Sequence, residues 1–185
     1  MQRSKSDKPA QRTDTQESSS LKLGSAVGKI NAIIYDGLST GDLAELRRIS
    51  PDEPFTPALW RVLLDLELDD APDWISQSKW ERRWATLLMG MARCAGLHSY
   101  DIPFGQALAE AGWSELRFVR LMRSDGQQLE TELRRLAQYL ASKNQRADWT
   151  DAGRLLFYQS GDTADDIRLQ ISRHYYKTLY AKEQQ

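Results

Sequence analysis

Four leucines constrain the fold more than any other feature of this sequence. They are Leu129, Leu133, Leu136 and Leu140, which are four, three and four residues apart. At 3.6 residues per turn, this spacing places all four on one face of an α-helix. Similar spacing recurs from Leu21 onward, and no convincing stretch alternates apolar and polar residues as a half-buried strand does. The sequence therefore predicts an all-α fold.

We expect about eight helices joined by short loops, forming a helical bundle. Several predicted ends carry the residues that helix ends favour. Thr56 and Pro57 provide a capping side chain and a first-turn proline, and Gly96 fits a left-handed residue after a long helix. The predicted helical segments are 27–36, 43–49, 57–68, 78–95, two helices within 104–123, 127–142, 149–157 and 164–182.

The first twenty residues differ from the rest of the chain. Residues 1–20 contain no Leu, Ile, Val or aromatic residue. Such a segment buries too little apolar surface to offset the loss of conformational entropy, so we expect a disordered tail. The chain is long enough for one sizeable core or two small helical subdomains. We divide it into an N-terminal helical subdomain, residues 21–100, and a C-terminal helical bundle, residues 101–185.

Cysteine content and hydropathy bear on the compartment. A single cysteine, Cys94, excludes an internal disulfide and gives no metal cluster. No apolar run approaches the roughly 18 residues that a membrane span needs, and the N-terminus lacks an apolar signal segment. We expect a cytoplasmic protein that does not contact a membrane.

Residues suited to catalysis are sparse. The two histidines, His98 and His174, have no ligand-like partner at helical spacing, and the chain has no phosphate-binding glycine loop or serine elbow. The acidic segment that begins at Asp65 superficially resembles a calcium loop. Such a loop needs Gly and Glu where this chain has Asp70 and Ser76. We expect no catalytic residue, no metal site and no cofactor, and therefore no enzyme.

Charge is segregated along the chain, although the formal net charge is only −1. Residues 36–73 carry ten acidic side chains against three basic ones, whereas residues 113–146 carry seven basic against four acidic. This distribution indicates an acidic flank and a basic surface. The alternative is that these charges pair locally along the helices.

The clearest basic pattern lies within residues 104–123. Gly112 separates a short helix from a second one, in which Arg117, Arg120 and Arg123 follow at a spacing of three. These arginines fall within about 120° of one another on a helix, and apolar residues occupy the opposite side. Such a basic face needs either carboxylates of the same protein or phosphates of a nucleic acid.

The same segment can be compared with a helix-turn-helix. DNA-reading versions rely on small residues where the two helices cross, yet Leu108 stands four residues before Gly112, where alanine is usual. The basic face also lacks the Asn or Gln that reads adenine, which favours contact with the nucleic-acid backbone over sequence readout. A helix-turn-helix transcription regulator is the alternative, and an adaptor that docks an acidic protein is a third hypothesis.

Taken in order, several blocks of the chain resemble the small subunit of the type I-E CRISPR surveillance complex, Cascade. The similarity covers roughly residues 25–180, and the blocks together are more specific than any one of them. They are Gly41–Arg48, Ile102–Gly112, Ser114–Arg123, Glu132–Leu136 followed by Asp148-Trp149, and Arg173–Tyr176.

The resemblance implies a non-enzymatic all-α subunit that contacts several protein and nucleic-acid partners. Two head-to-tail copies would lie beside the guide RNA, the backbone subunits and the large subunit. They would stabilise the R-loop along the target and displaced DNA strands without reading bases.

The resemblance carries the family's basic positions onto Arg48, onto Arg117 and Arg123, and onto the pair Arg134-Arg135. The match of Arg82 requires a gap, Arg120 adds charge that relatives need not have, and Gly126 stands where a further basic residue can occur. The alternative is pairing within the chain, of Arg47 or Arg48 with Glu45 or Asp52, and of Arg134 or Arg135 with Glu130 or Glu132. The candidate nucleic-acid-binding residues are Arg47, Arg48, Arg82, Arg83, Arg117, Arg120, Arg123, Arg134 and Arg135.

Overall fold

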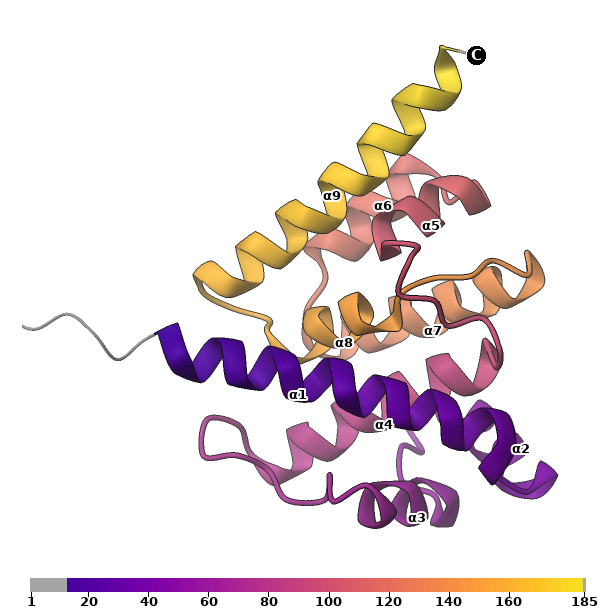
Figure 1. Cartoon of the computed structure of the whole chain (residues 1–185), viewed down its shortest axis with the longest axis vertical. Coiled ribbons are helices and arrows are strands. Elements are labelled where there is room, and N and C mark those ends of the chain that lie inside the picture. Colours follow the sequence, from indigo (N-terminus) through magenta and orange to yellow (C-terminus); the bar gives the residue numbers. More distant parts are fainter. Residues whose placement is uncertain (1–12, 185) are drawn as a thin grey trace, which may run out of the picture.

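A computed structural model of the protein describes residues 13–184, without the side chains of residues 13–22 (Figure 1). This range contains nine α-helices and one short π-helical turn, which confirms the all-α fold. The helices are α1 (Thr13–Ala32), α2 (Thr40–Arg48), α3 (Pro57–Asp65), α4 (Gln77–Arg93), α5 (Phe104–Ala111), α6 (Glu115–Arg123), α7 (Gly126–Ser142), α8 (Trp149–Phe157) and α9 (Asp162–Glu183), and the π-helical turn is η1 (Ile33–Gly37).

The predicted disordered tail, residues 1–20, falls mostly outside the described residues. Residues 1–12 are not described, and the backbone of residues 13–20 belongs to the first turns of α1. One predicted helix start is confirmed, because Thr56 accepts a hydrogen bond from the backbone N–H of Leu59 at 3.3 Å. Gly96 has the predicted left-handed φ, 77°, but α4 already ends at Arg93 with Cys94 as its cap.

Helix α4 lies at the centre of the fold. Every residue from Trp84 to Ala92 is buried, because α2 packs against one part of the helix and α7 and α8 against others. One hydrophobic cluster extends from Leu23 of α1 to Tyr175 of α9. The division into two subdomains at residue 100 stays a prediction, and the contacts of α4 with α7 and α8 cross it.

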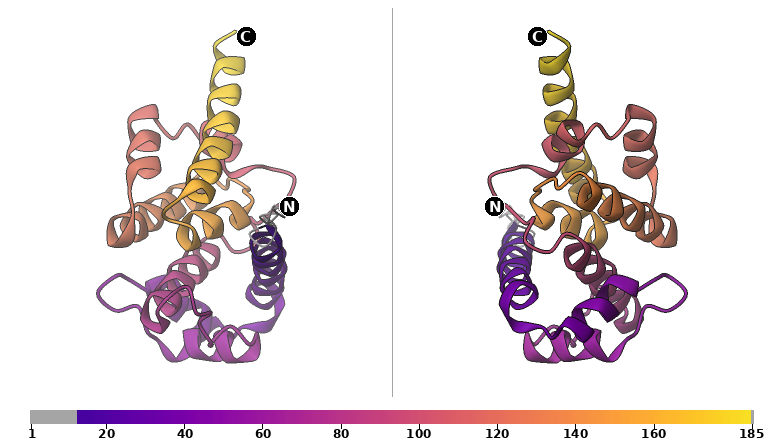
Figure 2. Two further views of the ribbon diagram at one scale, coloured as in Figure 1. Left: turned by 90° about the vertical axis from the view of Figure 1, so that its left-hand side faces the viewer. Right: turned by 90° about the vertical axis from the view of Figure 1, so that its right-hand side faces the viewer.

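Helix α9 holds the basic segment in place. It packs closely along α5 and also contacts α8, while its C-terminal end extends past the other helices (Figure 2). The ring of Phe118 in α6 stacks on that of Tyr175, with centroids 3.9 Å apart and planes 4° apart. The hydroxyl of Tyr175 also donates a 2.6 Å hydrogen bond to the carbonyl of Trp113. These contacts fix which face of α6 is turned away from the core.

Candidate nucleic-acid interface

Helix α6 presents its arginines as the sequence predicts. Phe118 and Leu121 are buried, whereas Arg117, Arg120 and Arg123 are exposed. The helix is nine residues long and offers two apolar anchors to α9 and the core. Its opposite side therefore carries the positive charge.

Helix α7 completes a groove beside α6. Two exposed arginines of α6 face an arginine of α7 across an open hollow of about 560 Å³. Tertiary packing brings these cations together, because they belong to two different helices joined by the loop between Arg123 and Gly126. The lining residues are Trp113, Arg117, Arg120, Glu132, Arg135, Gln138, Tyr139 and Ser142.

Two aromatic rings orient cations at this groove. The guanidinium of Arg117 lies 5.2 Å from the centre of the Trp113 ring, and the ammonium of Lys143 lies 5.7 Å from that of Tyr139. The two rings meet edge to face at 5.0 Å, and the Tyr139 hydroxyl donates to the carbonyl of Ala111 at 2.8 Å. Trp113 is only 5% exposed, so it supports a cation and does not offer a free face for base stacking.

One carboxylate reduces the charge of the groove. Arg135 donates to Glu132 at 2.8 Å, which is one of the pairings considered from the sequence. Glu132 is buried, whereas the side chain of Arg135 is 61% exposed and keeps donors free for another acceptor. Neither Arg117 nor Arg120 forms an ion pair with a carboxylate of the described residues. The groove therefore retains a net positive charge.

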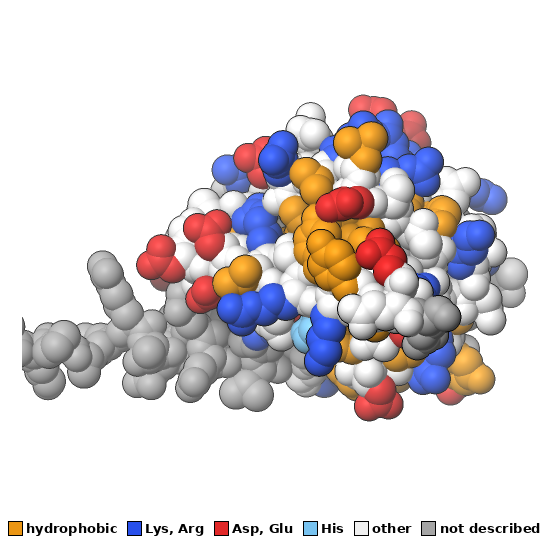
Figure 3. Space-filling view, turned by 90° about the horizontal axis from the view of Figure 1, so that it is seen from above, with side chains coloured by type: hydrophobic (Ala, Val, Ile, Leu, Met, Phe, Trp, Pro, Cys, Tyr) orange, Lys and Arg blue, Asp and Glu red, His pale blue; other side chains and the backbone are white. Residues whose placement is uncertain are grey.

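One end of the molecule is mixed in charge. Figure 3 looks onto the end of the molecule above α9 in Figure 1, and basic and acidic side chains lie there around a hydrophobic patch. The segregation along the sequence thus does not give a uniformly basic face at this end.

Three of the nine candidate arginines hold helices together through backbone carbonyls. Each donates to a backbone oxygen of another segment of the chain, so each has a structural role. The pairs are Arg47 Nε with Ala92 O at 2.9 Å, Arg82 Nη2 with Pro51 O at 2.7 Å, and Arg83 Nη1 with Phe157 O at 2.9 Å. Their contact with nucleic acid stays a prediction.

Two of these arginines, Arg82 and Arg83, are half-buried near a carboxylate of α7. Glu130 is buried and lies 3.8 Å from Arg82. Burial raises the pKa of Glu130, and the charges of Arg82 and Arg83 oppose this shift. Burial lowers the pKa of Arg83, and Glu130 acts in the opposite direction. The sequence suggested Arg134 or Arg135 as the partner of Glu130, whereas the structure places Arg82 there.

The remaining candidates lie apart from these contacts. Arg48 and Arg123 are exposed, and Arg134 is half-buried. Burial and the nearby charge of Arg134 lower the pKa of Arg93, an arginine that the sequence did not indicate as a candidate. No sequence pattern links Arg93 with Arg134, because their proximity arises where α4 crosses α7. Lys143 was also missed, although its i, i+4 spacing from Tyr139 is a signal for such a contact.

A comparison with protein families decides what the chain is related to. The family model of the CRISPR-associated protein Cse2 matches residues 42–176. The chain belongs to the Cse2 family. This confirms the resemblance to the Cascade small subunit, which rested on blocks of sequence in the family's order. No curated protein sequence matches the chain significantly.

Two solved structures share the fold of this Cse2 family member. One is a chain in the crystal structure of E. coli Cascade bound to a PAM-containing dsDNA target, with a TM-score of 0.62 and 22% identity over 87% of this chain and 96% of that chain. The other is CasB from Thermobifida fusca, with a TM-score of 0.64 and 19% identity over 84% of this chain and 96% of that chain.

The environment of α5 and α6 in this Cse2 fold bears on the helix-turn-helix alternative. Gly112 has a φ of 79° and ends α5, as the predicted break requires. Helix α5, however, packs most closely along α9, and α6 contacts α7. The small residue Gly105 serves the α5–α9 crossing. The arrangement differs from a pair of helices that pack chiefly on each other.

Two further observations concern membrane-spanning helices and metal-binding groups. Within residues 13–184, no helix is both long and apolar enough to cross a membrane. Among the same residues, no group of three or more His, Cys, Asp or Glu side chains is arranged to hold a metal ion.

Proposed function

We propose that this chain is the non-catalytic small subunit of a type I-E Cascade complex, and that its groove between α6 and α7 holds a nucleic-acid backbone. The observation that carries the proposal is the convergence of Arg117, Arg120 and Arg135 on one groove. The chain's membership of the Cse2 family supports the complex to which we assign it.

The chemistry of the groove suits phosphate. Arginine presents several donors in a plane, and it binds phosphate oxygens through charge-assisted hydrogen bonds. Gln138 and Ser142 add uncharged donors to the lining, which also occur in contacts with phosphates and sugars. The Trp113 ring contacts Arg117, the Tyr139 ring contacts Lys143, and the two rings contact each other. Backbone contact without base readout is therefore the expected mode.

The partners follow from the proposed complex. They are the backbone and large subunits, a second copy of this chain placed head to tail, the guide RNA, and the target and displaced DNA strands. The Cascade structure with a similar chain, which is bound to dsDNA, supports nucleic acid as a neighbour. A head-to-tail contact is heterologous, so it needs two different surfaces on each copy.

The test uses the complete complex with its guide RNA. Arg117→Gln and Arg120→Gln together remove two charges from the groove. At about 0.7 kcal/mol for each lost phosphate contact, the R-loop should dissociate roughly tenfold faster. The slope of log affinity against log salt should become shallower by about 1.4 for a single-strand contact.

A matched control removes two charges elsewhere. Lys29→Gln with Lys79→Gln changes the net charge equally at two exposed positions outside the groove. This control should leave R-loop lifetime unchanged. If both double variants behave alike, the groove is not the contact. If the purified protein instead prefers one duplex sequence over others, the helix-turn-helix regulator is the better description.

A further inference from the structure

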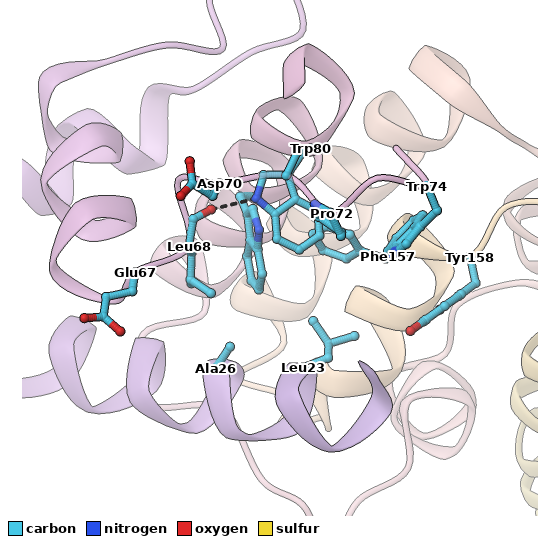
Figure 4. Close-up of a pocket in the computed structure, with 12 residues that line it drawn as sticks. Leu23, Ala26, Glu67, Leu68, Asp70, Pro72, Trp74, Trp80, Phe157 and Tyr158 are labelled. Carbon is cyan, nitrogen blue, oxygen red and sulfur yellow. Dashed lines mark hydrogen bonds between the residues drawn. The ribbon is translucent and has the colours of Figure 1, made fainter. Parts of the chain in front are cut away.

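A second hollow has a different chemistry from the groove. It has a volume of about 410 Å³ and lies between α1, α4, the end of α8 and the loop that joins α3 to α4 (Figure 4). Its lining is chiefly apolar and aromatic, and none of the lining residues among the described side chains is basic. They are Leu23, Ala26, Glu67, Leu68, Asp70, Ala71, Pro72, Trp74, Trp80, Trp84, Phe157 and Tyr158.

The aromatic wall of this hollow is already in place. Trp74 is 50% exposed, yet its ring stacks on Tyr158 with centroids 6.0 Å apart and planes 13° apart. It also meets Trp80 edge to face at 6.3 Å. The indole N–H of Trp80 donates to the carbonyl of Leu68 at 2.6 Å, which fastens the loop to α4 (Figure 4). The site is therefore preformed, so binding of an occupant would cost little conformational entropy in these side chains.

The rim of the hollow is acidic. Glu67 and Asp70 line it, and Asp69 and Asp73 belong to the same loop. These carboxylates repel a phosphate backbone and attract a cation. The hollow thus fits an occupant that combines an apolar side chain with a positive charge.

The backbone at Glu67 adopts an unfavourable conformation. Glu67 follows the end of α3 in the left-handed region, with a φ of 54°. Glycine is favoured at such positions, and this chain has glycine with φ values of 77° and 79° at Gly96 and Gly112. Replacing Glu67 with glycine should therefore remove the carboxylate from the rim and relieve backbone strain at the same time.

We propose that this aromatic hollow is a docking site for a peptide segment of another protein, in which an apolar side chain is flanked by Lys or Arg. The apolar side chain would lie on Trp80 and Phe157, and the cation beside Glu67 and Asp70 at the other side of the hollow from Trp74 (Figure 4). The site is separate from the groove between α6 and α7 and does not depend on nucleic-acid binding there.

The test is site-specific photo-cross-linking in the assembly that the full chain forms in cells. A benzophenone amino acid replaces Trp74, and the cross-linked peptide is sequenced by mass spectrometry. Tyr35, which is 71% exposed and outside the hollow, receives the same probe as a control. We expect position 74 alone to capture one peptide of a different protein, with Lys or Arg within three residues of the cross-link.

Two variants of Glu67 separate docking from folding. Glu67→Gly relieves the left-handed backbone and Glu67→Gln keeps the side chain's shape, and each should reduce the cross-link from position 74 several-fold. The melting temperature of Glu67→Gly should not fall. Cross-links to nucleic acid, to a second copy or to residues 1–12 of the same chain would overturn the proposal. So would the absence of a cross-link, or a yield that both variants leave unchanged.

Discussion

Gly105 of α5 lies directly against the carbonyl oxygen of Ile171 in α9. A Cβ atom at position 105 would overlap with this oxygen and stand 2.9 Å from the backbone nitrogen of Tyr175. Because both neighbours are backbone atoms, a side-chain rotation cannot make room. We expect Gly105→Ala to lower the free energy of unfolding by about 3 kcal/mol, measured by urea denaturation.

A second glycine provides the control for this variant. Gly41 lies in the first turn of exposed α2, where an added Cβ would meet the Ser39 hydroxyl at 3.7 Å, an ordinary contact. Gly41→Ala should leave stability unchanged or raise it by up to about 1 kcal/mol. If the two alanine variants are equally stable, the close crossing of α5 and α9 is not needed for the fold.

Asp151 should make stability depend on pH. Its carboxylate accepts a hydrogen bond from the backbone N–H of Phe104 at 3.3 Å. Burial raises the pKa of Asp151, and Asp148 adds to the shift, whereas Arg154 and His174 oppose it. The native state therefore holds this proton to a higher pH than the unfolded chain, so the free energy of unfolding falls as pH rises between the two pKa values.

Asp151→Asn tests this sign, since the amide keeps an acceptor for Phe104 but does not ionise. The variant should gain stability relative to the wild type at pH 7. That gain should shrink as pH falls through the raised pKa and be smallest below the pKa of the unfolded chain. Urea denaturation at pH 7 and pH 4 measures the difference. A gain that grows on acidification would contradict the assignment.

Cys94 should be unreactive in the folded protein. Its thiol is buried, its sulfur lies 3.4 Å from the carbonyl of Ala137, and burial raises its pKa to about 12. Very little thiolate therefore exists at pH 8. A chromogenic disulfide reagent should label no thiol in the native protein and one per chain in denaturant. Rapid labelling of the native protein would show that α4 and α7 separate readily.

Arg83 and Arg120 should contribute differently to the stability of the fold. Arg83→Met leaves the Phe157 carbonyl without its donor and deprives Glu130 of a counter-charge, so it should cost about 2 kcal/mol of stability. Arg120 is exposed and pairs with no described carboxylate, so Arg120→Met should change stability by less than about 0.5 kcal/mol. Thermal unfolding of both variants distinguishes a structural arginine from one available for binding.

Much of the local structure follows from residue spacing. The leucines of α7, the cap at Thr56 and the two faces of α6 depend on neighbours within a few residues, so periodicity and end preferences predict them. The family was also recognisable, because its blocks occur in order along the chain. The exposed arginines at positions 117, 120 and 123 are a direct consequence of that local pattern.

The group that each arginine contacts could be identified only from the tertiary structure. The sequence alone left open whether each arginine meets a carboxylate of its own chain or remains available. Packing of α6 beside α7 brings Arg135 to Arg117 and Arg120. Packing of α4 against α7 and α8 directs Arg82 to Glu130 and Arg83 to the Phe157 carbonyl. Sequence spacing determined which face of a helix is charged. Only the tertiary structure decided what that face meets, because such contacts join residues far apart in the chain.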